Sequence, residues 1–327
     1  MKEKQIVLCS HCIVSLPVDR RQGKHLCKDC ESVLSHPDRD KFFGQNNIFQ
    51  QEFNSFLESL SGGRLIFAFS GGLDSTLALV RLVEECSSRN IQIFPFTVDY
   101  GFKGDVTWRN IRAVISRLGL EENFRVIDIQ NKALPDSVKT AVTASEGLNT
   151  FDHYRRCCQD GRIPCGPLCN PIMDTSYAEV LKEFGEQFLV GGGEIPRLNK
   201  LGKYSIFWEK SPGLTIVRGW LGLGCKKSDS MTVFNQKQIP WTHPHTGGYD
   251  TDCLIPGAIL HKLYEGCPST TIEETSEKFE VLLPWLSNRV RWHLYSREKA
   301  LKLATNIDLA SPQSLLELQQ LCAVQAD

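Results

Sequence analysis

The sequence has no apolar run close to the roughly eighteen residues that a membrane-spanning helix needs. It also has no excess of either charge, because 37 Lys and Arg stand against 38 Asp and Glu, for a formal net charge of −1. No strong basic field therefore indicates a nucleic-acid partner, although a local basic patch would suffice for one. Residues 1–5 are charged and no signal-type apolar stretch follows them, so we expect a cytoplasmic protein without a membrane partner.

Hydrophobic residues make up 41% of the 327 residues and charged residues 23%, which is ordinary for a globular protein with a sizeable core. This length suits one large domain with attachments, or two domains. Cysteine is abundant, at thirteen residues. In a chain without a secretion signal, that number favours metal binding or thiol chemistry over a disulfide framework.

Four of these cysteines form two C-x2-C pairs near the N-terminus: Cys9 with Cys12, and Cys27 with Cys30. Each pair presents two thiolates from one turn, and two such turns complete a tetrahedral zinc site. We therefore predict a zinc ribbon over residues 1–35. Its role is expected to be structural, because all four ligand positions are filled and none is open to a substrate.

The rest of the chain predicts an α/β fold. Residues 36–60 have apolar side chains at helical spacing and predict a connecting helix. Residues 61–255 alternate between apolar strands and amphipathic helices, which predicts a parallel Rossmann-like sheet with helices on both faces. Residues 256–327 predict a helical C-terminal extension. The expected strands are 65–69, 91–99, 124–129 and 188–190, and the expected helices are 77–85, 107–118, 177–184, 258–264, 275–283 and 290–304.

A glycine-rich loop joins the first expected strand to the first helix: Ser70, Gly71, Gly72, Leu73, Asp74, Ser75 and Thr76. Two glycines let the backbone approach an anion closely, and the helix N-terminus favours negative charge there. An acidic residue such as Asp74 suits a phosphate site mainly if Mg2+ or an ordered network lies beside it. The loop is not a Walker A motif, because no Gly-Lys pair follows.

This arrangement resembles the signature S-G-G-x-D-S of the PP-loop ATP pyrophosphatase family, over approximately residues 62–255. The resemblance implies an adenine nucleotide alpha hydrolase-like fold and cleavage of ATP into AMP and pyrophosphate. It assigns the phosphate-loop roles to Ser70, Gly71, Gly72, Asp74, Ser75 and Thr76. It also implies nucleotide contacts at the end of the second strand, at Val98, and at the glycine-containing strand end, at Gly192.

A second cysteine group consists of Cys165, Cys169 and the distant Cys253. Three thiolates could hold an iron–sulfur cluster with one open iron, whereas a single thiolate of low pKa could carry sulfur as a persulfide. The group is similar to that of the tRNA-thiolating branch of the family, which implies a 4Fe–4S cluster and a sulfur donor. The pair here is C-x3-C instead of C-x2-C, which leaves Cys157 or Cys158 as substitutes. A second structural metal site, or plain packing, remains the alternative.

A second branch also fits. PP-loop amidotransferases acting on N-acetyl sugars begin with cysteine pairs too, and the stretch from Val98 to Ile111 resembles theirs. That reading implies a small-molecule substrate and a separate glutaminase partner that supplies ammonia. Two further features stay open: the basic and aromatic residues 289–302 could grip RNA, and His243 and His245 could contact substrate or metal. A nucleotide-sensing protein without catalysis is the non-enzymatic alternative.

Overall fold

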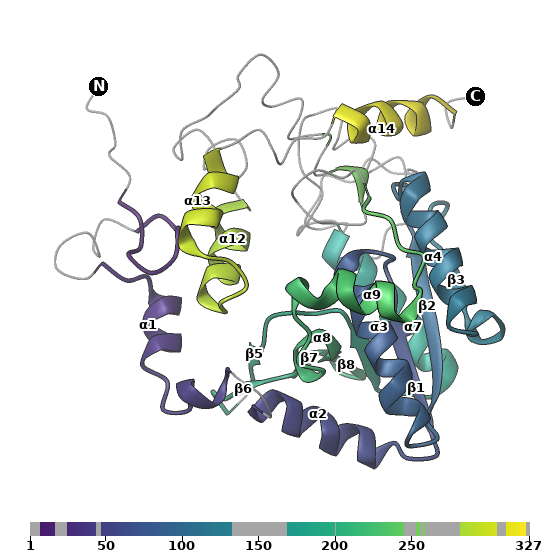
Figure 1. Cartoon of the computed structure of the whole chain (residues 1–327), viewed down its shortest axis with the longest axis horizontal. Coiled ribbons are helices and arrows are strands. Elements are labelled where there is room, and N and C mark those ends of the chain that lie inside the picture. Colours follow the sequence, from purple (N-terminus) through teal and green to yellow (C-terminus); the bar gives the residue numbers. More distant parts are fainter. Residues whose placement is uncertain are drawn as a thin grey trace. The chain divides into compact units, whose positions relative to one another are not determined.

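The chain is described by a computed structural model, which defines residues 7–16, 25–43, 47–132, 169–199, 201–244, 253–255, 258, 282–305 and 312–324 (Figure 1). It divides into two compact units. Unit 1 consists of residues 1–47 and 260–310, and unit 2 of residues 48–259 and 311–327. No helix in these described ranges is long and apolar enough to cross a membrane.

Unit 2 is built on a six-stranded sheet with the order β3-β2-β1-β4-β8-β7. Its strands are β1 (Arg64–Ala68), β2 (Gln92–Asp99), β3 (Arg125–Asp128), β4 (Phe188–Gly191), β7 (Phe207–Ser211) and β8 (Leu214–Arg218). All neighbours pair in parallel except β7, which pairs antiparallel with β8 at one edge. A separate two-stranded hairpin is formed by β5 (Arg197–Leu198) and β6 (Tyr204–Ser205). The predicted α/β class is therefore confirmed.

The position of β1 explains its sequence. It lies between β2 and β4, so both of its faces are covered. Leu65, Ile66 and Phe67 are consecutive and all are buried, as expected for a strand without a solvent face. The strand order reverses between β1 and β4, and in open α/β sheets a ligand binds outside the carboxyl ends of the strands at such a point.

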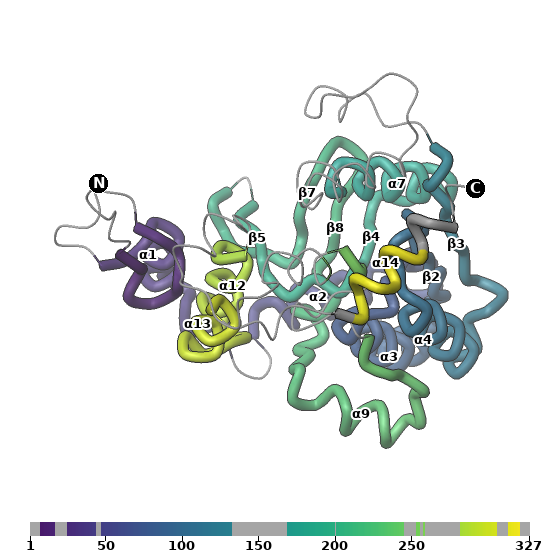
Figure 2. The backbone as a smooth tube through the Cα atoms, turned by 90° about the horizontal axis from the view of Figure 1, so that it is seen from above, coloured from purple at the N-terminus to yellow at the C-terminus, as the bar shows by residue number. Residues whose placement is uncertain are grey.

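Helices cover both faces of the sheet (Figure 2). The crossovers β1–β2 and β2–β3 run through α3 (Leu73–Ser87) and α4 (Asp105–Arg117), which lie on one face. The crossover from β3 to β4 runs through α7 (Cys169–Phe184) on the other face. This placement follows from right-handed connections in opposite directions from the central strand.

The remaining helical elements of unit 2 are short or peripheral: α2 (Ile48–Ser59), η3 (Glu121–Asn123), α8 (Gly219–Gly222), η4 (Lys227–Asp229), α9 (Ser230–Lys237) and α14 (Pro312–Val324). Helix α2 is the predicted connecting helix, and its apolar face buries Phe49, Phe53 and Leu57. Helix α8 packs against α2, and at Gly222 even a Cβ atom would overlap the ring of Phe53.

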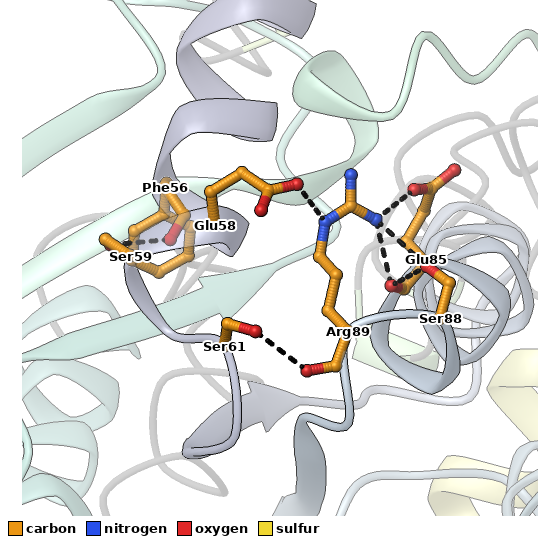
Figure 3. A network of polar contacts seen from close by, with 7 residues as sticks. All are labelled: Phe56, Glu58, Ser59, Ser61, Glu85, Ser88 and Arg89. Carbon is orange, nitrogen blue, oxygen red and sulfur yellow. Dashed lines mark hydrogen bonds and ion pairs between the residues drawn. The ribbon is translucent and has the colours of Figure 1, made fainter.

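A polar network joins α2 to the C-terminal end of α3 (Figure 3). Arg89 Nε donates to Glu58 Oε1 at 2.9 Å, and its Nη1 donates to Glu85 Oε2 at 2.7 Å. Ser61 Oγ donates to the carbonyl of Arg89 at 3.1 Å. These contacts lie just before β2 begins, so they brace the amino ends of the strands and leave the carboxyl ends to the site.

The predicted start of helix α7 is wrong, and its predicted end is confirmed. It begins at Cys169, eight residues before the expected start, because Pro171 occupies an early helical position that tolerates proline. It ends as predicted at Gly185, whose φ is +68°. The Gly185 N–H donates to Lys182 O and the Glu186 N–H to Leu181 O, as in a Schellman cap.

Unit 1 contains α1 (Lys28–Leu34), η2 (Arg39–Lys41), α12 (Leu282–Arg291) and α13 (Arg297–Thr305). The predicted single helix 290–304 is wrong. His293 adopts a left-handed φ of +59°, and the N–H groups of His293 and Leu294 bond back to Val290 and Arg289. This closes α12 with a Schellman cap, and α13 begins only after the turn. The predicted helices 258–264 and 275–283 lie largely outside the described residues.

Candidate functional site

The glycine-rich loop lies where β1 ends and α3 begins, at the point where the strand order reverses. Gly71 has a φ of +83°, and a Cβ atom there would lie 2.6 Å from Ile111 Cγ1 of α4. Both facts require glycine. Gly72 is the N-cap of α3 in extended backbone, so the first turn of α3 directs its N–H groups to the carboxyl edge of the sheet.

The loop hydroxyls hold the turn together. Ser70 Oγ and Ser75 Oγ share a hydrogen bond of 2.9 Å, and the Gly72 N–H donates to Ser70 Oγ at 3.3 Å. Thr76 Oγ1 donates to the Gly72 carbonyl at 2.8 Å. The loop is therefore shaped before any ligand arrives, which lowers the ordering cost of binding an anion.

The end of β4 contributes the other half of the site. A Cβ atom on Gly192 would lie 3.0 Å from the backbone N and Cα of Ser75, so only glycine lets β4 approach α3 this closely. Gly193 lies against the side chain of Arg218, since a Cβ atom on Gly193 would be 2.4 Å from Arg218 Cδ. Gly192 therefore lies against the first turn of α3, and its expected contact with the nucleotide stays a prediction.

Charged groups surround the loop. Lys227 Nζ lies 3.4 Å from Asp74 Oδ1 and also 3.4 Å from Glu194 Oε1, and the Glu194 side chain is only 5% exposed. Two carboxylates therefore converge beside the phosphate loop. Carboxylate oxygens are the protein ligands that Mg2+ prefers, so Asp74 and Glu194 fit a magnesium ion that accompanies a nucleotide. Lys227 was not predicted, whereas Glu194 ends the glycine-containing segment expected to border the nucleotide.

A buried lysine approaches from the second strand. Lys103 follows β2, is 4% exposed, and its Nζ donates to the Ser70 carbonyl at 3.4 Å. Its backbone pairs with Cys253 in an isolated antiparallel bridge, and the Leu254 N–H donates to Phe102 O at 3.0 Å. Cys253, far away in the sequence, is therefore paired with the residue whose side chain contacts the phosphate loop.

Segment 241–244 is fastened to the loop and to α4. The Trp241 Nε1–H donates to the Gly71 carbonyl at 3.0 Å. Buried Asn110 donates its Nδ2–H to Thr242 O at 2.6 Å and accepts from the Thr242 N–H at 2.9 Å. His243 lies next to the Trp241 ring, with centroids 5.8 Å apart. His245 lies outside the described residues.

The end of β2 carries the predicted nucleotide contact Val98, which is 3% exposed. The next residue, Asp99, accepts a hydrogen bond from the Gly101 N–H at 2.9 Å and one from Gln130 Nε2 at 3.1 Å. Burial raises the pKa of Asp99, and these hydrogen bonds oppose the shift. The carboxylate shapes the turn after β2 at the same edge of the sheet as the phosphate loop.

The second cysteine group is described in part. Cys169 is the first residue of α7, and Cys253 pairs with Lys103, so both belong to the carboxyl edge. Cys165, Cys157 and Cys158 lie outside the described residues. Cys225, in the turn after α8, is a further thiol near Asp74; burial raises its pKa to about 12. A thiol with such a pKa is a poor nucleophile at neutral pH.

The four N-terminal cysteines of unit 1 converge as the spacing predicts. Cys9, Cys12, Cys27 and Cys30 are all buried, and their sulfur atoms lie within 4.8 Å of one another. Cys12 Sγ and Cys27 Sγ are 3.8 Å apart. A tetrahedral zinc ion with Zn–S bonds of about 2.3 Å separates its ligands by about that distance, so the four thiols fit zinc. Among the described residues, this is the one such group of potential metal ligands.

Arginines from the C-terminal helices of unit 1 reach this cluster. Arg291 Nη2 donates to Cys27 Sγ at 3.7 Å and pairs with Asp29 Oδ2 at 3.2 Å. Arg297 Nε donates to the Cys12 carbonyl at 3.2 Å. Hydrogen bonds from the Cys12 and Cys30 thiols, with smaller contributions from the Cys30 N–H and Arg291, lower the pKa of Cys27 against the effect of burial. Cys27 is thus the thiol that favours the thiolate, the metal-binding form, whereas the hydrogen bond to Cys27 raises the pKa of Cys12, and hydrogen bonds to Cys12 and Cys27 raise that of Cys30.

No known protein-family model matches this sequence. Among curated proteins, the uncharacterized protein MJ1599 of Methanocaldococcus jannaschii is 25% identical over 300 residues, covering 90% of this chain and 91% of that protein. Among solved structures, the chain is similar to the U34-tRNA thiolase NcsA from Methanococcus maripaludis with its 4Fe–4S cluster. That match has a TM-score of 0.36 and 12% identity, and it covers 92% of this chain and 89% of the other.

A second similar structure is the NH3-dependent NAD synthetase from Campylobacter jejuni in complex with a nitrate ion. Here the TM-score is 0.30 with 13% identity, over 85% of this chain and 93% of the other. Scores at this level carry no argument about activity. The function has to be argued from the residues of the chain itself.

Proposed function

We propose that this chain is an enzyme that cleaves ATP into AMP and pyrophosphate and uses the AMP to activate an oxygen atom of an acceptor. The observation that carries this proposal is the loop Ser70–Thr76, which lies at the reversal of the strand order with Gly192 pressed against its helical turn. The resemblance to the PP-loop signature S-G-G-x-D-S supports the same reaction.

The reaction divides into two displacements. The acceptor oxygen attacks the α-phosphorus of ATP, the bond from that phosphorus to the β-bridging oxygen breaks, and pyrophosphate leaves. A second nucleophile then attacks the carbon that bears the adenylated oxygen, and AMP departs with that oxygen. The N–H groups of α3 and the ammonium of Lys103 stabilise negative charge at the loop. Asp74 and Glu194 would hold the Mg2+ that accompanies the pyrophosphate.

We propose sulfur as the second nucleophile. The support is the position of two thiols, Cys169 at the start of α7 and Cys253 beside Lys103, at the edge where the activated acceptor would lie. With Cys165 they would hold a 4Fe–4S cluster or pass on a persulfide from a sulfur donor. The acceptor would then be a tRNA or a small molecule with a carbonyl-type oxygen.

The second candidate is an amidotransferase, in which ammonia from a separate glutaminase takes the place of sulfur. One observation favours it: the four-cysteine site of unit 1 accounts for metal binding by itself, so the second cysteine group is not required for a metal. An N-acetyl sugar or a similar small molecule would be the acceptor. In both candidates Cys9, Cys12, Cys27 and Cys30 hold structural zinc.

The first step is tested by measuring AMP and pyrophosphate release from ATP and Mg2+, with total tRNA or N-acetyl sugars as acceptors. Asp74→Asn should suppress both products. Asp105→Asn is the matched control, because Asp105 is an exposed carboxylate at the first turn of the neighbouring helix α4. Release of ADP and phosphate would refute the proposed cleavage, and turnover unchanged by Asp74→Asn would refute the metal-side role of Asp74.

The nucleophile is tested after anaerobic purification. Iron and sulfide that disappear in Cys165→Ala and Cys169→Ala, together with sulfur transfer to the acceptor, would support thiolation. A colourless protein that contains zinc alone and uses ammonia would support the amidotransferase instead.

A further inference from the structure

Three cationic side chains gather around the ring of Trp208 in unit 2. Lys210 Nζ lies 4.2 Å from the ring centroid, Arg197 Cζ 4.7 Å and Arg218 Cζ 4.8 Å. They come from three strands, β5, β7 and β8. We call these three residues, with Trp208, the basic cluster. Like charges repel at such distances, so the cluster needs a compensating partner.

The charges of the cluster are only partly balanced. Lys210 pairs with Asp174 Oδ2 of α7 at 2.7 Å. Within the described ranges, Arg197 and Arg218 form no ion pair or hydrogen bond, and the Nε of Arg218 is a buried donor without an acceptor. Burial, and then the neighbouring Arg197, lowers the pKa of Arg218 to about 10. A buried donor without an acceptor is unfavourable, and this cost is recovered when an anion binds.

The basic cluster lies next to the proposed reaction site. Arg218 is the last residue of β8, pairs with Gly191 at the end of β4, and packs against Gly193. Lys210 lies at a bulge in the β7–β8 pairing, and its Nζ reaches over the ring of Trp208. Lys210 is on the α7 side of the sheet, since it pairs with Asp174 of α7.

Helix α7 also carries one thiol of the second cysteine group. Cys169 opens the helix, and Asp174 follows five positions later. At 1.5 Å per residue this separates the two positions by about 7.5 Å along the helix axis. Asp174, the partner of Lys210, thus lies within two helical turns of Cys169 on the α7 side of the sheet, whereas the phosphate loop belongs to α3 on the opposite face.

We propose that Arg197 and Arg218 bind a phosphate group of the acceptor and so anchor it beside Cys169. This inference rests on the proposed function, because it names the substrate class of the same site. Guanidinium groups match phosphate with paired N–H donors, and the face of Trp208 holds both in place. The phosphate could belong to an RNA backbone or to a phosphorylated small molecule.

The test compares the double variant Arg197→Gln/Arg218→Gln with the control Lys203→Gln, an exposed lysine on the same β5–β6 hairpin. The probes are inorganic phosphate, a sugar phosphate and total tRNA for the anion, and a fluorescent ATP analogue for the nucleotide. We expect the double variant to lose about ten-fold or more in affinity for an anionic probe, with ATP affinity within about two-fold of wild type.

The three anionic probes distinguish an RNA phosphate from the phosphate of a small molecule. The ATP analogue distinguishes failure of this inference from failure of the proposed function. Loss confined to tRNA, with a salt slope reduced by about one to two ions, indicates an RNA acceptor. Loss of sugar phosphate or inorganic phosphate alone indicates a small molecule. An equal loss of ATP affinity would assign the cluster to the nucleotide and overturn the inference, and so would unchanged binding of every anionic probe. The binding readouts do not depend on turnover, so they remain decisive if no pyrophosphate is released.

The melting temperature of each variant is measured as a control for correct folding. If the double variant is unstable, the single variant Arg197→Gln provides the same comparison, because Arg197 is exposed and its removal leaves the sheet intact.

Discussion

The indole Nε1–H of Trp241 donates a hydrogen bond of 3.0 Å to the carbonyl oxygen of Gly71, 170 positions earlier in the chain. This bond holds the glycine that has a left-handed backbone in the phosphate loop. Segment 241–244 therefore stabilises the backbone conformation of the phosphate loop, although it is not part of that loop.

Trp241→Phe removes this donor while keeping an aromatic ring. A lost hydrogen bond to a buried carbonyl costs about 1 kcal/mol, so we expect ATP affinity to fall roughly five-fold, measured by titration with a fluorescent ATP analogue. Thr242→Ala is the control: its side chain is exposed, and its bonds to Asn110 come from the backbone. Equal affinities in both variants would contradict the supporting role.

Gly192→Ala tests the contact between β4 and α3. The added Cβ would lie 3.0 Å from backbone atoms of Ser75, which cannot move without shifting the loop. Overpacking of this kind costs about 1–3 kcal/mol, and we expect most of it as lost ATP affinity and pyrophosphate release. Gly191→Ala is a close control, because nothing lies within 4 Å of its Cβ position. A loss of the same size in Gly191→Ala would show that the contact with Ser75 is not the cause.

Arg291→Gln tests how unit 1 holds its metal. The side chain of Arg291 is 5% exposed and donates to Cys27 Sγ, so its loss removes a charged donor from the thiolate. Groups that support metal ligands in this way typically change affinity by about 10–100-fold, so we expect zinc to pass to a chromophoric chelator at least several times faster. Lys299→Gln, on the exposed side of α13, should match wild type. Release at the wild-type rate in Arg291→Gln would refute the role.

The buried carboxyl group of Glu52 should make the free energy of unfolding depend on pH. Its Oε2 accepts from the Ile206 N–H at 3.0 Å and from Ser205 Oγ at 3.2 Å, and burial raises its pKa against these bonds. A carboxyl whose pKa is higher in the folded state binds more protons there, so the free energy of unfolding falls as pH rises from the unfolded pKa to the folded one.

In the variant Glu52→Gln, the contribution of Glu52 to this decrease in the free energy of unfolding should be absent. Denaturant titrations between pH 4 and 7 would show wild type losing stability relative to the variant as pH increases, with the exposed Glu122→Gln as a parallel control. A wild type that gains stability over the variant with rising pH would contradict the raised pKa.

The sequence predicts the centre of the fold well because its elements are locally encoded. The strand β1 is a continuous apolar run, α3 and α4 have helical periodicity, and the Gly185 cap has its glycine. The hairpin β5–β6 and the edge strand β7 were not predicted. Strands β5 and β6 have only two residues each, and the edge strand β7 has no buried residue, so none of the three forms the apolar run that identifies a strand in the sequence.

The candidate site likewise has parts that the sequence predicts and parts that it does not. The phosphate loop and the four N-terminal cysteines are short motifs whose spacing carries their chemistry. Lys103, Glu194 and Lys227 join the loop from three separate segments, and only the fold brings them together. A buried lysine after β2 offers no motif, although its place at a carboxyl strand end is a signal that could have been used.

The link between Cys27 and Arg291 has a consequence for biosynthesis. The two residues are 264 positions apart, and all of the central sheet is translated between them. At roughly 5–20 residues per second, Arg291 is added about 13–50 s after Cys27. During that interval the nascent chain exposes four metal-binding thiols without the helices that finally enclose them. If zinc binds as proposed, loading it during translation would protect these thiols from oxidation before the helices enclose them.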